Sequence, residues 1–259
     1  MPHFCATSYS KAHEFLTDDP DCPISCRAVT VLLSVPSTTN TTTNTTTNTN
    51  TNTMNFLAHL HLADHCQSNL TGNLLADFVR GDPYRFYTPD VAAGIKLHRF
   101  VDSYIDSQPE IRAWRQQFPP TIRRVSGIAL DMIWDHYLAR HWTAFHDLPL
   151  AQFVQQARHE IEQFQEPEPE TYQQMTRRMW TQEWLLQYQQ ESAIHHALAR
   201  MAIRRPKLHA LTECPPFLAA HYQALEQSFF ILYPRLMQAS KAYWLESRDS
   251  LIQQGHTQV

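Results

Sequence analysis

The chain has 259 residues, a formal net charge of −4, 43% hydrophobic residues and 11% aromatic residues. This slight negative charge gives no electrostatic attraction to nucleic acid, so we expect no nucleic-acid partner. The five scattered cysteines are typical of a reducing compartment and favour the cytoplasm, and no run of about 18 apolar residues predicts a membrane span.

The beginning of the chain differs in composition from the rest. Residues 38–53 are almost wholly Thr and Asn, which cannot form a hydrophobic core, so we expect residues 1–53 to be a disordered, low-complexity extension. Met54 opens the first well-patterned segment, and we predict that it is the natural start of the protein. Residues 54–246 are expected to form one helical domain, followed by a polar, frayed tail at 247–259.

From Met54 onwards the sequence predicts an all-α fold, a single helical bundle. Glycine is rare, with five residues, and no clear alternation of apolar and polar residues indicates a sheet. Thr88, Pro89 and Asp90 form a strong helix start, and Pro234 is expected to kink the last helix. The predicted segments are an apolar lead-in at 55–62 and helices at about 68–80, 88–106, 119–141, 150–164, 171–179, 182–189, 192–203 and 216–243.

The predicted helix at 119–141 carries carboxylates on its apolar face. Ile128, Asp131, Asp135 and Trp142 lie at helical spacing on one side, with His136 about 100° round the helix at the edge of that side. Burying unpaired carboxylates costs several kcal/mol or forces them to take up protons. A bound cation would remove that cost, whereas the alternative of a solvated acidic face is disfavoured by the flanking apolar residues.

The predicted helix at 88–106 shows the same substitution of polar for apolar residues. Ile95, His98, Asp102 and Ile105 share one face, and residues four apart on a helix are neighbours. The imidazole of His98 and the carboxylate of Asp102 could therefore hold one ion. The alternative is a buried hydrogen bond between the two that only orders the core.

Two earlier segments add further candidates. Asp77 lies in an apolar face four residues after Asn73, which could be no more than a hydrogen-bonding group at a helix end. His59 and His61 alternate with Leu in the apolar lead-in. Either histidine alone is more often a satisfied core residue than a metal ligand.

Together these residues offer oxygen and imidazole donors and no convincing thiolate. Such a set suits Mn²⁺, Mg²⁺ or Fe²⁺ better than a structural zinc ion. A divalent cation held with open positions can activate water and clamp a phosphoryl oxygen, so metal-assisted hydrolysis of a phosphoester is the expected reaction. The candidate metal ligands are His59, Asp77, His98, Asp102, Asp131 and Asp135, and the candidate catalytic residues are Asp77, His98, Asp131 and His136.

The region from Met54 to about Trp244 resembles the bacterial acyl carrier protein phosphodiesterases. The matching strings, in order, are MNFLAHLHLA, LTGNLLADFVRGDP, PDVAAGIKLHRFVDSYIDSQPE, RRVSGIALDMIWDHYLARHW and MAIRRPKL. The resemblance implies removal of the 4′-phosphopantetheine arm from holo-acyl carrier protein, an acidic protein substrate, to leave a free serine on the apo form. It also implies dependence on a divalent metal, typically Mn²⁺, and Asp77 as the best candidate for an essential residue.

The resemblance further implies a distant relation to the HD-domain phosphohydrolases. Their usual signature is a His, an adjacent His-Asp pair and a later Asp, whereas this chain has the reversed pair Asp135-His136. The ligands of HD domains therefore cannot be carried over by motif alone. Arginines near 123–124 or 204–205 are expected to meet the acidic carrier protein or the phosphate.

Two other functions stay open at this point. One is an HD-like phosphohydrolase that acts on a nucleotide or another small phosphodiester, which predicts turnover without a carrier protein. The other is a non-catalytic helical binding protein whose buried His–Asp pairs only order the core, which predicts no bound metal. The sequence does not indicate an oligomeric state.

Overall fold

The computed structural model describes residues 56–256, with side chains described up to residue 248. The chain divides into two units, residues 1–50 and 51–259, and everything described below belongs to the second unit. The prediction of a disordered extension at 1–53 lies outside the described residues.

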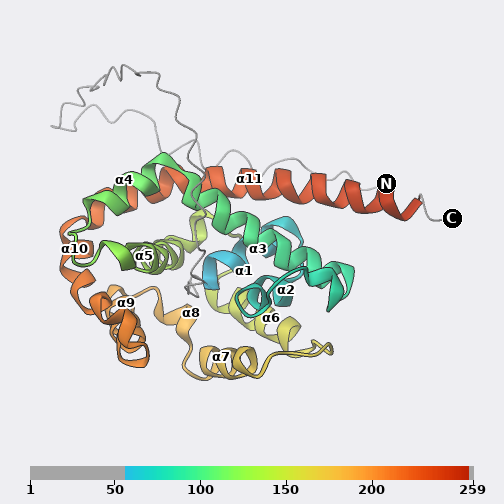
Figure 1. The fold of residues 1–259 in the computed structure, drawn as a ribbon, viewed down its shortest axis with the longest axis horizontal. Coiled ribbons are helices and arrows are strands. Elements are labelled where there is room, and N and C mark those ends of the chain that lie inside the picture. Colours follow the sequence, from blue (N-terminus) through green and yellow to red (C-terminus); the bar gives the residue numbers. More distant parts are fainter. Residues whose placement is uncertain (1–55, 257–259) are drawn as a thin grey trace, which may run out of the picture. The chain divides into compact units, whose positions relative to one another are not determined.

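The prediction of an all-α fold is confirmed, because every regular element among residues 56–256 is helical (Figure 1). None of the described helices is both long and apolar enough to cross a lipid bilayer. The 3₁₀ helices used below are η2 (Ala76–Phe78), η4 (Arg123–Val125) and η6 (Pro206–Glu213). The α-helices are α1 (Phe56–Cys66), α2 (Leu70–Leu75), α3 (Pro89–Ser107), α4 (Pro109–Gln117), α5 (Ser126–Arg140), α6 (Leu150–Glu162), α7 (Glu170–Thr181), α8 (Trp184–Gln187), α9 (Glu191–Arg204), α10 (Cys214–Ala220) and α11 (Tyr222–His256).

Helix α1 runs through the middle of the described core. Nine of its eleven residues are buried, including both histidines, and a helix that is apolar on all sides must be enclosed by others. It packs against α2, α3, α5 and α11, and Figure 1 shows it between α3 and α5. A polar side chain on α1 is therefore placed in the interior wherever it points.

Helices α2 and α3 pack at unusually short range. A Cβ atom on Gly72 would lie 2.3 Å from the carbonyl oxygen of Val91, and one on Gly94 would lie 2.8 Å from the carbonyl oxygen of Asn69. Only glycine at both positions permits this approach. The close packing brings η2, which directly follows α2, against the middle of α3.

Several predicted boundaries differ from the structure. Pro109 ends α3 as expected, but it also occupies the first turn of α4, a helix that was not predicted and that buries Ile111 and Trp114. The proline pair at 119–120 precedes a turn and η4 rather than a helix, so α5 begins only at Ser126. At the C-terminal end, α10 and α11 are separate helices, and α11 continues through Pro234 to His256, beyond the predicted end at Tyr243.

Candidate metal centre

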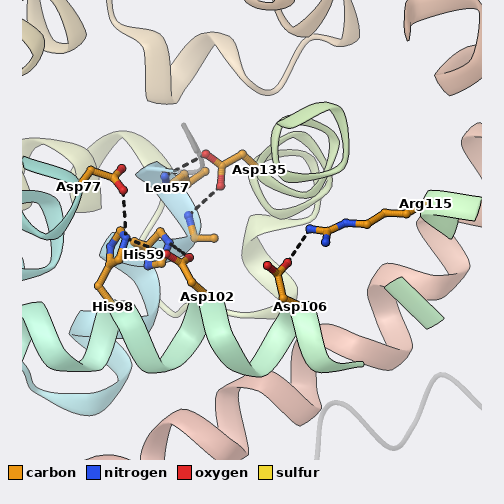
Figure 2. A network of polar contacts seen from close by, with 9 residues as sticks. Leu57, His59, Asp77, His98, Asp102, Asp106, Arg115 and Asp135 are labelled. Carbon is orange, nitrogen blue, oxygen red and sulfur yellow. Dashed lines mark hydrogen bonds and ion pairs between the residues drawn. The ribbon is translucent and has the colours of Figure 1, made fainter. Parts of the chain in front are cut away.

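Four of the predicted residues converge in the interior of the bundle (Figure 2). His59 comes from α1, Asp77 from η2, and His98 and Asp102 from α3. Nε2 of His59 lies 3.2 Å from Oδ1 of Asp102. Nε2 of His98 lies 3.2 Å from Oδ2 of Asp102 and 3.6 Å from Oδ1 of Asp77. Both imidazoles thus face a pair of carboxylates.

Local structure explains how each group reaches this point. His98 and Asp102 are one helical turn apart on α3, so their side chains leave the same face. Helix α2 tightens into η2 and the chain becomes extended at Val79, which turns Asp77 towards α3. The guanidinium of Arg99 then donates to the carbonyl oxygens of Gly81 and Val79 at 2.7 and 2.6 Å, tying the segment after Asp77 to α3.

The two imidazoles lack the partners that buried polar groups need. Their rings stack with centroids 3.6 Å apart and planes at 14°. His59 and His98 are only 1% and 3% exposed, and none of their four ring nitrogens has a hydrogen-bond partner of acceptable geometry. The approaches to Asp102 are thus ion-pair contacts rather than hydrogen bonds. Since buried polar atoms are nearly always satisfied, the cluster is incomplete as a purely structural network.

A divalent cation fits this set of donors. One ligand atom each from His59, His98 and Asp102 lies within 4.8 Å of the others, and the carboxylate of Asp77 adjoins His98. Two imidazoles with carboxylate oxygens are the donors that Mn²⁺ and Fe²⁺ accept in proteins. No described protein group forms a hydrogen bond with the nitrogens of the stacked rings. A bound cation would provide the partner that these nitrogens lack.

Electrostatics in the cluster favour positive charge. Burial lowers the pKa of His98, but the carboxylates of Asp102 and Asp77 outweigh burial and raise it to about 10. Burial and the neighbouring His98 lower the pKa of His59. Burial alone would raise the pKa of Asp102, but the imidazoles of His98 and His59 lower it. The carboxylates therefore hold a proton on His98 that a metal ion would have to displace.

Asp135 is fully buried but lies at a different point. Its Oδ1 accepts from the backbone N–H of Ala58 at 2.8 Å, and its Oδ2 accepts from that of Leu57 at 3.1 Å. Both oxygens thus accept hydrogen bonds from the first turn of α1, where the unpaired backbone amides and the helix dipole favour an acidic side chain. Burial raises the pKa of Asp135 to about 8, even though the amides of Ala58 and Leu57 act to lower it.

The structure does not bring His136 to the cluster. Its Nδ1 lies 2.8 Å from the carbonyl oxygen of Tyr188, and its Nε2 lies 2.6 Å from the hydroxyl of Tyr222. Both ring nitrogens thus have partners, at the end of α8 and at the start of α11. His61 is likewise satisfied, by the carbonyl of Phe145 and the hydroxyl of Tyr233, as expected of an ordinary core histidine.

Asp131 occupies an intermediate position. It is partly buried on α5 and makes no hydrogen bond or ion pair with the rest of the described chain. Burial and the carboxylates of Asp102 and Asp106 raise its pKa well above the usual value, so it lies within electrostatic reach of the cluster. Asp106 itself pairs with Arg115 at 2.5 Å, away from the histidines (Figure 2).

A cavity of about 450 Å³ adjoins the cluster, and Asp77 lies in its wall. The cavity is lined from α1, η2, α7, α8, α9 and η6. No local sequence pattern predicts this cavity, because its walls come from segments more than 100 residues apart, and only the basic run at 204–205 is a local signal. Phe56 and Trp184, whose rings stack 6.4 Å apart, form part of its apolar lining.

Comparison with known proteins agrees with the sequence resemblance. A model of the acyl carrier protein phosphodiesterase family matches residues 54–236. The acyl carrier protein phosphodiesterase of Pectobacterium atrosepticum is 47% identical over 193 residues, which is 74% of this chain and 100% of that protein. Its namesake in Escherichia coli is 46% identical over 190 residues, covering 73% of this chain and 98% of that protein. No solved structure matches, so the relation to HD domains stays a prediction. The chain belongs to the acyl carrier protein phosphodiesterase family.

Proposed function

We propose that this protein is a metal-dependent phosphodiesterase that hydrolyses the 4′-phosphopantetheine arm from holo-acyl carrier protein and releases apo-acyl carrier protein. The names of its relatives support the substrate. The observation that carries the metal dependence is the stacked pair His59 and His98, whose four buried ring nitrogens are unsatisfied beside two carboxylates. We place the reaction in the cytoplasm, in keeping with the free thiols of Cys66 and Cys214.

His59, Asp77, His98 and Asp102 are the proposed ligands, and Mn²⁺ is the preferred ion, with Mg²⁺ or Fe²⁺ as substitutes. A bound divalent cation supplies Lewis acidity, which lowers the pKa of water and neutralises charge on a phosphoryl oxygen. Asp77 belongs both to the cluster and to the cavity wall, so it marks where the scissile phosphate would lie.

Hydrolysis requires that the oxygen of water bonds to phosphorus while the bond from phosphorus to the serine oxygen breaks. The water gives one proton to the solvent, and the departing serine oxygen must gain one from an acid that takes its own proton back from the solvent. Asp131 is our candidate for the proton donor, because it is partly exposed and has no hydrogen-bond partner among the described residues. We assign Asp135 and His136 to structural roles, since their polar atoms are engaged elsewhere.

The decisive experiment is a gel assay of purified protein with holo-acyl carrier protein and Mn²⁺. We expect conversion to the apo form, complete inhibition by a chelator, and loss of conversion in Asp77→Asn. Asp147→Asn is the matched control, because the side chain of Asp147 is exposed and makes no hydrogen bond or ion pair with the other described residues. No conversion by the wild-type protein, or full conversion by Asp77→Asn, would contradict the proposal.

The same assay separates the two other functions. Turnover of a nucleotide or another small phosphodiester, with holo-carrier protein left intact, would indicate a small-molecule phosphohydrolase. A protein that converts nothing and shows no change in melting temperature with Mn²⁺ would be a binding protein with an ordered polar core.

A further inference from the structure

The cavity beside Asp77 is bordered by four arginines: Arg80, Arg178, Arg204 and Arg205. They come from three separate parts of the chain, namely the segment after η2, the last turn of α7 and the end of α9. All four are exposed, and their guanidinium groups make no hydrogen bond or ion pair with any described residue. The cavity mouth is therefore a cluster of unpaired positive charge on a chain whose net charge is −4.

This concentration of charge is more than the reacting group requires. A phosphodiester carries a single negative charge at neutral pH, which one arginine beside the metal centre would neutralise. Guanidinium groups bind carboxylates in paired geometry, and positive patches attract acidic protein surfaces. The remaining arginines are therefore available to bind acidic groups on the protein part of the substrate, outside the cavity.

Away from the arginines the cavity lining is mostly apolar, with Asp77, Thr171 and Gln174 as its other polar residues. Phe56, Trp184 and Met201 are buried residues in its lining, and Met175 and Leu208 are partly buried beside them. A flexible, largely uncharged arm could enter this space, whereas a folded protein could not. The two kinds of lining thus match the two halves of a carrier protein with its arm.

We propose that Arg178, Arg204 and Arg205 form a docking surface for carboxylates on the protein half of the substrate, while the arm enters the apolar cavity and the scissile phosphate lies at Asp77. This inference rests on the proposed function and adds to it the recognition of the protein half. It also decides between the two arginine clusters at 123–124 and 204–205 in favour of the second.

The test uses apo-acyl carrier protein, which lacks both the phosphate and the arm, so that its binding reports only the protein half. We expect the full-length wild-type protein to bind it in a salt-sensitive manner. Arg204→Glu and Arg205→Glu should each weaken binding about tenfold, or about 1.4 kcal/mol. Arg204→Gln should show a smaller loss. Arg112→Glu is the matched control, because Arg112 is exposed, unpaired among the described residues and lies on α4, which contributes nothing to the cavity lining.

Kinetics provide the second readout. With holo-carrier protein, Arg178→Glu, Arg204→Glu and Arg205→Glu should raise KM by about tenfold and leave kcat nearly unchanged, since rim charges act on encounter rather than on chemistry. Melting temperatures with and without Mn²⁺ should equal those of the wild type, which shows that the variants fold and keep the metal centre. Unchanged KM and unchanged binding of the apo form in these variants, with normal turnover by the wild type, would overturn the docking surface alone. Absence of wild-type turnover would instead refute the proposed function.

Discussion

At the scale of single residues, the chemistry of the site depends on what His59 and His98 lack. Two stacked imidazoles cannot both be protonated at 3.6 Å without strong repulsion, and neither ring donates or accepts a well-formed hydrogen bond. Their burial makes each missing partner costly. A cation placed between these rings and the carboxylates of Asp77 and Asp102 would remove both penalties at once.

The first prediction is that Mn²⁺ stabilises the protein through His98. At a Mn²⁺ concentration of about 100 times Kd, the free energy of unfolding should rise by about 2.7 kcal/mol. His98→Ala should abolish this rise, because it removes a ligand, and His209→Ala should retain it, because His209 is exposed and lies outside the cluster. Thermal melting with and without Mn²⁺ measures the effect. An equal shift in His98→Ala would exclude His98 as a ligand.

The second prediction concerns the pH dependence of stability at Asp135. Its folded-state pKa of about 8 exceeds the unfolded value near 4, so between these values the folded state binds a proton that the unfolded state has released. The stability from this proton is complete below pH 4 and is lost as pH rises through 8, with a slope of up to about 1.4 kcal/mol per pH unit.

Asn cannot titrate, so Asp135→Asn should lose less stability than the wild type between pH 5 and pH 8. Chemical denaturation at pH 5 and pH 8 gives the change in the free energy of unfolding for each protein. Subtracting the change in the variant from the change in the wild type cancels the contribution of all other titrating groups. Parallel slopes would mean that the amides of Leu57 and Ala58 keep the carboxyl ionised in the folded state.

The sequence predicts a contact only when the two partners lie close together along the chain. His98 and Asp102 share a turn of one helix, so helical spacing alone predicts that they meet. Asp135 looked equivalent to them, but its partners are backbone amides 77 and 78 residues earlier, which no local pattern can indicate. Its burial was predicted correctly, while the group that offsets the cost of burial came from the tertiary fold.

At the scale of elements, the site depends on the close packing of α2 against α3. The two glycines at the crossing, Gly72 and Gly94, allow the backbones to touch, and Arg99 ties the segment after η2 to α3. Sequence periodicity predicted α3 almost to the residue. It missed α4, because Pro109 is both a stop signal for one helix and a favourable first-turn residue for the next.

The third prediction tests this packing with Gly72→Ala. The added methyl group would lie 2.3 Å from the backbone oxygen of Val91, which cannot move independently of α3. We expect a loss of about 1–3 kcal/mol in the free energy of unfolding, and reduced turnover because Asp77 shifts relative to His98. Chemical denaturation and the carrier protein assay provide the two measurements.

Gly127→Ala is the matched control for Gly72→Ala. Its methyl group would meet only the end of the Arg115 side chain, at 3.0 Å, and this side chain can shift at the cost of part of its solvent-exposed pair with Asp106. Since alanine is favoured over glycine inside a helix by about 1 kcal/mol, this variant should be as stable as the wild type or more so. Equal losses in both variants would show that the α2–α3 contact is not specially tight.

At the scale of the whole molecule, the metal centre and the core depend on the same helix. Helix α1 contributes His59 to the cluster, Phe56 to the cavity and two amides to Asp135, and it contacts helices from both ends of the described chain. Damage to α1 should therefore reduce stability and activity together. Of the residues before it, those at 38–53 are almost wholly Thr and Asn, which cannot build a core.

The fourth prediction separates these two parts of the chain. A shortened protein that begins at Met54 should keep the melting temperature, the Mn²⁺ response and the turnover of the full-length protein, because every residue of the proposed site follows Met54. A protein that begins at Leu60 should fail in all three, since it lacks His59, Phe56 and the amides that Asp135 binds. The two shortened proteins differ by only six residues, yet the first is expected to be unaffected and the second to lose both fold and function. A marked loss in the protein that begins at Met54 would show that residues 1–53 contribute to stability or catalysis, and the predicted start at Met54 would then be wrong.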